Sequence, residues 1–184
     1  MHIFLLYTLI YKKELFIRLN EKIDLNIPNI TQLCLNIGLP FSILQSKYKF
    51  LSNLICLEKM TEQKIFFTYA KKQNTFLNLK KYALTGFKVN LTNYNSYIFI
   101  DFFIFQVLFS LSEQYKITQK NFYQNNLFLN FENYINIYII FKIFYLLDML
   151  YPLNIMISIQ KNNKNNLDLI YSLMLFSCLF FPIT

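Results

Sequence analysis

Charged residues interrupt every long apolar stretch of this chain, and this limits the folds open to it. A helix that crosses a bilayer needs about 20 mostly apolar residues in succession. Asp101 and Glu113 leave only 11 residues between them. Lys142 and Asp148 divide the next apolar region, and the tail after Asp168 offers 16 residues. The sequence therefore predicts a protein without a membrane span that buries its apolar side chains in a core of its own.

The amino-acid composition, taken alone, would indicate a membrane protein. The chain is 55% hydrophobic, with a mean hydropathy of +0.31, and it holds 21 Phe but only 2 Gly and no Trp. Phe, Leu, Ile, Asn, Lys and Tyr are abundant, and most of their codons are rich in A and T. We therefore attribute the apolar excess to an AT-rich, organellar genome. A subunit of an organelle-encoded membrane complex remains the alternative function.

Periodicity along the chain predicts one α+β domain at 21–184, preceded by an amphipathic helix at 4–20 within an N-terminal segment 1–20. Apolar residues at three- and four-residue spacing predict further helices, and alternating apolar and polar residues predict strands. Polar loops are expected at 113–126 and 161–166. The expected helices are 42–60, 94–112 and 167–179, and the expected strands are 30–38, 64–69, 85–92, 127–141 and 153–160.

The strand at 85–92 shows the pattern of a half-buried antiparallel strand. Two other strands alternate in the same way, with Thr31, Leu33, Leu35, Ile37, Leu153, Ile155, Ile157 and Ile159 expected inward and Gln32, Cys34, Asn36, Asn154, Met156, Ser158 and Gln160 outward. We expect a mainly antiparallel sheet with helices on one face and a polar face open to RNA. The predicted core beneath the sheet contains Leu33, Leu35, Phe87, Val89, Leu91, Ile155 and Ile157, and the predicted polar face contains Lys88, Asn90 and Thr92.

Residues that could carry catalysis or bind a metal are scattered. Cys34, Cys56 and Cys178 are widely spaced, and the one histidine is His2, so no metal-ligand spacing is present. No glycine-rich phosphate loop exists, and no second carboxylate stands near a candidate nucleophile. The sequence predicts no enzyme, no metal site and no cofactor.

Lysines concentrate in residues 61–90. Six lysines against one glutamate, Glu62, give this stretch a net charge of +5 out of the +8 of the whole chain. Ammonium groups neutralise phosphates, and amide side chains bind 2′-hydroxyls and base edges. An RNA-binding face is therefore expected, with an ordinary solvated sheet face as the alternative interpretation. The lysines are Lys64, Lys71, Lys72, Lys80, Lys81 and Lys88.

Two segments, "IPNITQLCLNIGLP" (27–40) and "TEQKIFFTYAKKQNTFLNLKKYALTGFKVNLTN" (61–93), resemble the ribosomal protein L five family, the universal large-subunit protein five. The closing segments "LNIMISIQK" and "LFFPIT" are similar to the end of the family pattern. The resemblance spans about residues 15–184 and marks a divergent, mitochondrially encoded member. The matching positions are Gln63, Lys64, Thr68, Ala70, Lys71, Lys72, Leu79, Lys80, Gly86, Lys88, Val89 and Leu91.

The resemblance implies a structural constituent of the large ribosomal subunit, in its central protuberance, within the mitochondrial matrix. It implies contact with large-subunit ribosomal RNA, including 5S RNA where present, with neighbouring mitochondrial ribosomal proteins, and with small-subunit head proteins across the intersubunit bridge. The implied RNA-binding residues of the sheet face are Asn36, Gln63, Lys64, Lys88, Asn90 and Thr92. A loop facing the peptidyl-site tRNA would carry Lys71, Lys72, Lys80 and Lys81.

The sequence departs from the family pattern after the strand at 85–92. Thr92 and Asn93 stand where the family has arginine and glycine. Threonine cannot make the bidentate phosphate or guanine contacts of arginine. We therefore expect protein neighbours to replace part of the RNA contact area.

Overall fold

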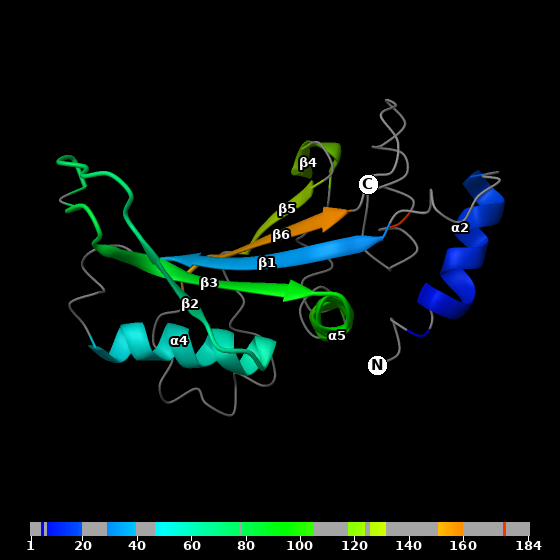
Figure 1. Ribbon diagram of the computed structural model, residues 1–184, viewed down its shortest axis with the longest axis horizontal. Coiled ribbons are helices and arrows are strands. Elements are labelled where there is room, and N and C mark those ends of the chain that lie inside the picture. Colours follow the sequence, from blue (N-terminus) through cyan, green and yellow to red (C-terminus); the bar gives the residue numbers. More distant parts are fainter. Residues whose placement is uncertain are drawn as a thin grey trace. The chain divides into compact units, whose positions relative to one another are not determined.

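The computed structural model describes residues 5, 7–19, 29–39, 47–77, 79–104, 118–123, 126–131, 151–159 and 175. Its elements within these ranges begin with a short π-helix and a first α-helix, and the strands follow with two α-helices and a 3-10 helix between them (Figure 1). They are η1 (Tyr7–Tyr11), α2 (Lys12–Leu19), β1 (Ile30–Gly38), α4 (Lys47–Thr61), β2 (Phe66–Tyr69), β3 (Leu84–Thr92), α5 (Tyr94–Phe103), the 3-10 helix η4 (Gln119–Asn121), β4 (Phe122–Tyr123), β5 (Asn126–Phe131) and β6 (Leu153–Ile159).

The strands form a six-stranded sheet in the order β2-β3-β1-β6-β5-β4. Pairs β2/β3 and β4/β5 are antiparallel, and the arrows of β3, β1 and β6 alternate in direction in Figure 1. Helices are interspersed along the chain rather than forming regular crossovers between parallel strands. The predicted α+β class with a mainly antiparallel sheet is confirmed.

The chain divides into two compact units, which are described separately. The first unit comprises residues 1–33, 91–129 and 156–184, and the second comprises residues 34–90 and 130–155. All ten predicted site residues except Thr92 belong to the second unit.

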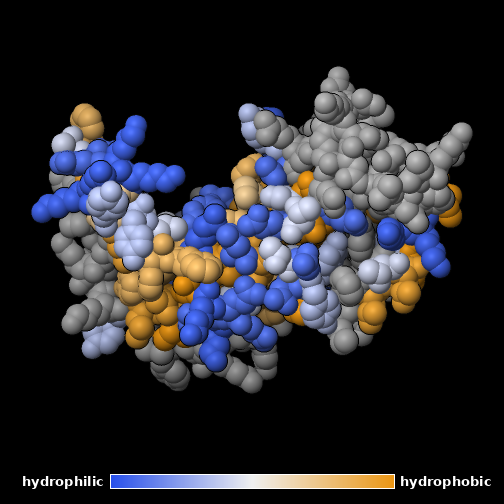
Figure 2. Space-filling model, in the orientation of Figure 1, coloured by the Kyte–Doolittle hydropathy of each residue, from blue (hydrophilic) through white to orange (hydrophobic). Residues whose placement is uncertain are grey.

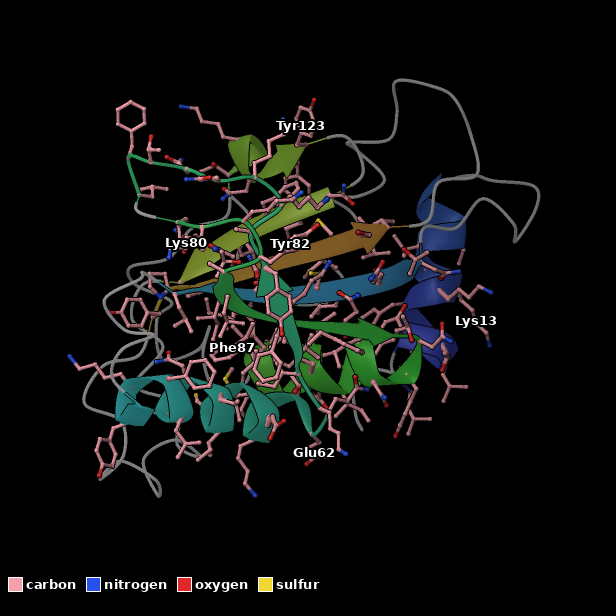
Figure 3. All side chains as sticks on the ribbon, turned by 60° about the vertical axis from the view of Figure 1, so that its left-hand side comes forward. Lys13, Glu62, Lys80, Tyr82, Phe87 and Tyr123 are labelled. Atoms are coloured by element: carbon pink, nitrogen blue, oxygen red, sulfur yellow. The ribbon has the colours of Figure 1, made fainter. Side chains whose placement is uncertain are left out.

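Three aromatic rings join α4 to the strands of the second unit. Phe50 of α4 lies edge-on to Phe87 of β3, with 4.9 Å between ring centroids, and parallel to Phe67 of β2 at 6.3 Å. Phe67 and Phe87 are themselves 5.8 Å apart. Aromatic rings at these separations add favourable edge and stacking interactions to the burial of their apolar area. This cluster fixes α4 on one face of β2 and β3, as Figure 3 shows for Phe87.

A buried amide makes a second connection from α4. The side chain of Asn53 donates from Nδ2 to the Lys49 carbonyl at 2.8 Å and accepts at Oδ1 from the Tyr151 backbone N–H at 3.0 Å. Asn53 is completely buried, and a buried amide without such partners would cost free energy. The bond from Tyr151 therefore holds the segment that leads into β6 against α4, and the bond to Lys49 within the helix satisfies the other end of the amide.

In the second unit, β3 approaches β1 very closely at Gly86. A Cβ atom at Gly86 would clash with the Ile37 carbonyl oxygen, and the Leu39 N–H donates to the Thr85 carbonyl at 2.9 Å. No L side chain fits such a gap, because the obstructing atoms are backbone. Glycine is required here by contact between strands.

In the first unit, α5 directly follows β3 and buries one side. Phe99 and Phe103 stack with ring centroids 5.8 Å apart, and the Tyr97 hydroxyl accepts from the Ile30 backbone N–H at 3.4 Å. Beside this helix, Thr31 Oγ1 donates to the Ser158 carbonyl at 3.0 Å. These contacts connect α5 and the ends of β1 and β6.

The seven predicted core residues, Leu33, Leu35, Phe87, Val89, Leu91, Ile155 and Ile157, are all buried. The alternation of β6 is also confirmed, with its four inward side chains buried. Two positions of β1 differ in exposure from what the alternation alone predicts, although Cys34 lies on the outward face as expected. Thr31 is exposed because it lies at the start of the strand, where its hydroxyl bonds to a neighbouring backbone carbonyl. Cys34, expected outward, is only 6% exposed because the Lys88 side chain lies against it.

Element boundaries differ from the sequence predictions by more than one residue in three places. The strand expected at 64–69 begins at Phe66. The N-terminal helix begins with the π-turn η1. The loop expected at 113–126 contains η4 and the short strand β4, because β4 pairs with β5 through Phe122 opposite Leu127.

Several predictions fall on residues outside the described ranges. These are the ends of the N-terminal helix, residues 42–46, 105–117 and 132–141, Gln160, the loop at 161–166, and the helix at 167–179 apart from Leu175, which is helical.

Candidate nucleic-acid interface

The outward face of β1 and β3 in the second unit carries Asn36, Lys88 and Asn90. Strand alternation places them there, because Phe87 and Val89 point the other way into the core. Asn90 is exposed, and Asn36 and Lys88 are half-buried. An ammonium group flanked by two amides on an open strand surface can bind a phosphate and the hydroxyl or base edge beside it.

Cys34 lies on this face next to Lys88. Burial raises the pKa of the Cys34 thiol, and the nearby Lys88 ammonium offsets part of that rise. The thiol is therefore protonated at neutral pH and packs as a small apolar group beneath the lysine. Its contribution is to support the Lys88 side chain.

Phe66 also belongs to this face, although it was not among the RNA-binding residues predicted from the sequence. In the β2/β3 register Phe66 stands opposite Lys88, and Phe67 stands opposite Phe87. Phe66 is 66% exposed. The signal in the sequence was its position two residues after Lys64 in the expected strand, which assigns it to the outward face.

Gln63 and Lys64 lie before β2, in the segment after α4. Lys64 was predicted to begin the strand, which instead begins at Phe66. The chain needs these residues to leave the helix: Glu62 adopts a positive φ of 52°, and its N–H donates to the Glu58 carbonyl at 2.8 Å. Gln63 then donates from its N–H to Thr61 Oγ1 at 3.4 Å. The helix exit therefore removes both residues from the strand face.

The surroundings of Lys64 are mixed in charge. A shallow depression of about 410 Å³ is lined by Glu58, Lys59, Glu62, Gln63 and Lys64. Two carboxylates here oppose two lysines, so this site has little net attraction for phosphate. Of the two predicted sheet lysines, Lys88 has the surroundings better suited to RNA.

Thr92 is exposed at the end of β3. It belongs to the first unit, so the structure does not group it with Asn36, Lys88 and Asn90.

The segment between β2 and β3 extends their pairing as a hydrogen-bonded hairpin, described at residues 70–77 and 79–83. Ala70 donates to Ala83 at 2.8 Å and accepts from Tyr82 at 2.9 Å, and Asn74 and Leu79 exchange two bonds of 2.9 Å. At the tip, Asn74 Oδ1 accepts from the Phe76 N–H at 3.0 Å. The predicted tRNA-facing loop is therefore a hydrogen-bonded hairpin.

All four predicted loop lysines, Lys71, Lys72, Lys80 and Lys81, are exposed on this hairpin. Figure 2 shows hydrophilic side chains gathered over the hairpin with apolar atoms at its tip, where Phe76 is 98% exposed. The Lys81 ammonium lies 5.0 Å from the centre of the Tyr82 ring, within the range of a cation–π interaction. Figure 3 shows Lys80 and Tyr82 on the side of the strands away from α4.

Within the described ranges, no group of three His, Cys, Asp or Glu side chains could hold a metal ion. None of the helices formed by these residues is both long and apolar enough to cross a membrane. No protein-family model matches the chain.

Proposed function

We propose that this chain is a structural, non-catalytic RNA-binding protein of the mitochondrial large ribosomal subunit, placed in its central protuberance. The resemblance to the ribosomal protein L five family motivates the assignment, and the form of the second unit supports it. One face of its strands packs on α4, and the other carries Asn36, Lys88 and Asn90.

The observation that carries the proposal is the distribution of charge on the hairpin. Lys71, Lys72, Lys80 and Lys81 are exposed on an arm with a hydrogen-bonded backbone. The sequence contains no Asp or Glu from Gln63 to Ile100. Four ammonium groups without carboxylate neighbours along the arm attract a polyanion, and each contact with a phosphate releases counterions.

The two basic regions have different partners in this proposal. The sheet face binds large-subunit ribosomal RNA, including 5S RNA where the ribosome contains it. The hairpin reaches towards the peptidyl-site tRNA. Neighbouring mitochondrial ribosomal proteins and small-subunit head proteins cover the remaining apolar surface.

Sedimentation of organelle lysates tests the proposal. The chain should co-sediment with the large subunit, and ribonuclease or high salt should release it, because phosphate contacts weaken steeply with salt. A known integral membrane protein and a known large-subunit protein serve as controls in the same gradient. Release by detergent alone, with no association with ribosomal RNA, would instead indicate the membrane-complex subunit.

A further inference from the structure

We infer that Phe66 and Lys88 together form a binding site for one unpaired nucleotide, with the base stacked on the Phe66 ring and its phosphate at the Lys88 ammonium. The inference rests on the proposed RNA-binding function and deepens it, because it assigns single-stranded rather than duplex RNA to the sheet face. Neither the lysine cluster nor the resemblance to a family includes Phe66.

The register of β2 and β3 places Phe66 beside Lys88. Phe66 and Lys88 are cross-strand partners, and such partners have Cβ atoms about 5 Å apart on the same face of a sheet. The Phe66 ring and the Lys88 side chain therefore leave the same face from neighbouring strands, so a base stacked on the ring would have its phosphate within reach of the flexible lysine. An aromatic side chain beside a cation on a sheet is an arrangement that binds single-stranded nucleic acid.

The Phe66 ring does not pack in the core. Phe67 packs with Phe50 and Phe87 on the α4 side. Among the described rings of this unit, none stacks on Phe66, which is 66% exposed. Its diagonal neighbour on β3 is Gly86, which has no side chain. The flank of the ring is therefore open to a flat partner.

The Phe66 ring has polar and basic neighbours on the outward face. The outward positions next to Phe66 on β2 and β3 hold Thr68, Gly86, Lys88 and Asn90, and none of these is apolar or acidic. The centre of a protein interface needs a contiguous apolar patch, whereas a nucleotide needs one flat ring, a cation and polar groups. These surroundings favour a nucleotide over a protein partner.

The test uses the full chain with two RNA probes, a 12-nucleotide oligouridylate and a 12-base-pair RNA duplex. Phe66→Leu keeps an apolar side chain but removes the aromatic ring, and Phe66→Tyr keeps the ring. Phe66→Leu should weaken oligouridylate binding at least about five-fold and leave duplex binding unchanged. Phe66→Tyr should bind both probes like the wild type.

Two further variants provide controls. Lys88→Gln should weaken oligouridylate binding and reduce its salt dependence by about 0.7 of a unit of slope, since it removes a contact with a single-strand phosphate. Tyr48→Leu removes an aromatic side chain of α4 that is 83% exposed, and it should bind both probes like the wild type. Equal melting temperatures would show that the variants are folded.

Photo-crosslinking locates the base directly. A 4-thiouridine oligomer should crosslink to the tryptic peptide 65–71, which contains Phe66, and the yield should fall in Phe66→Leu. If Phe66→Leu binds oligouridylate normally while Lys88→Gln does not, the stacking site is wrong and RNA binding stands. If the wild type binds neither probe, the RNA-binding function fails as well. Normal RNA binding by Phe66→Leu with loss of subunit assembly would identify a protein contact instead.

Discussion

Phe66 and Lys88 face each other across β2 and β3, and the very next pair is Phe67 with Phe87. Because side chains alternate along a strand, consecutive phenylalanines serve opposite faces. Phe67 joins the ring cluster with Phe50 of α4, and Phe66 remains on the outward face. The same two residues of β2 therefore connect the core of the second unit to its candidate binding surface.

The close approach of β3 to β1 predicts opposite outcomes at the two glycines of the chain. Gly86→Ala places a methyl group against the Ile37 carbonyl and should reduce the free energy of unfolding by at least about 2 kcal/mol. Gly38→Ala meets nothing within 4 Å and should leave stability unchanged or raise it by up to about 1 kcal/mol. Urea denaturation measures both. Equal midpoints for the two variants would contradict the described contact.

The alternation of β3 predicts that substitutions at two adjacent residues change the stability by very different amounts. Val89 is 1% exposed, so Val89→Asp buries an unpaired charge and should destabilise the fold by about 3 kcal/mol or more. Asn90 is exposed, and Asn90→Asp should change stability by less than about 0.5 kcal/mol. Chemical denaturation of the free chain distinguishes them, and a tolerated Val89→Asp would show that the strand register is wrong.

Burial of Cys56 predicts an alkaline loss of stability. Burial raises the pKa of the thiol from 9.0 to about 12, so the unfolded chain loses this proton above pH 9 while the folded chain keeps it. Unfolding is then favoured as pH rises from 9 towards 12, by about 1.4 kcal/mol per pH unit. The advantage of the wild type over Cys56→Ala in unfolding free energy should fall accordingly between pH 9 and pH 11. Parallel pH profiles for the two proteins would contradict this prediction.

The hairpin lysines predict a separation of assembly from tRNA retention. Replacing Lys71, Lys72, Lys80 and Lys81 by Gln should leave incorporation into the large subunit intact and weaken retention of peptidyl-site tRNA, because the sheet face retains Lys88. A variant with Lys12→Gln and Lys13→Gln removes charge from α2 instead and should retain tRNA normally. Gradient sedimentation followed by tRNA quantification reports both quantities. Failure of the hairpin variant to enter the subunit would assign these lysines to ribosomal RNA.

The hydrogen bonds of the Asn74 side chain predict which backbone amides of the hairpin become less protected when that side chain is removed. Its Oδ1 accepts from the backbone N–H groups of Phe76 and Leu77. Asn74→Ala should speed hydrogen exchange at these two amides and change the global unfolding free energy by less than about 1 kcal/mol. Thr75→Ala, at the adjacent exposed position, should leave the exchange rates unchanged. Unchanged exchange in Asn74→Ala would show that the turn forms without this side chain.

Strands with one buried face were predictable because their side chains repeat every two residues. The predicted 30–38 matches β1, and the inward residues of β3 and β6 are those expected. The start of β2 was not predictable in this way. It depends on how α4 ends. Glu62 adopts a left-handed conformation there, although this conformation is usually predicted from a glycine, and the resulting exit from the helix places Lys64 before the strand.

Phe66 was missed for a different reason. In a chain with 21 phenylalanines, a phenylalanine is normally expected in the core. The alternation with Lys64 indicates the outward face for Phe66, but it does not show that Lys88 stands across the sheet from it. The turn of the hairpin was also not predictable from the sequence, because it includes a hydrogen bond from the Phe76 N–H to the Asn74 side chain. The lysines could be selected from sequence because charge rarely enters a core.

The position of β2 at the edge of the sheet affects the chain before any partner binds. An edge strand exposes backbone N–H and C=O groups that can pair with another copy and start aggregation. β2 is only four residues long, its pairing shifts register between Thr68 and Tyr69, and Lys71 and Lys72 follow it directly. Short length, irregular pairing and adjacent charge each discourage the addition of a foreign strand. These features lower the tendency of a free copy of the chain to pair with another copy through this edge.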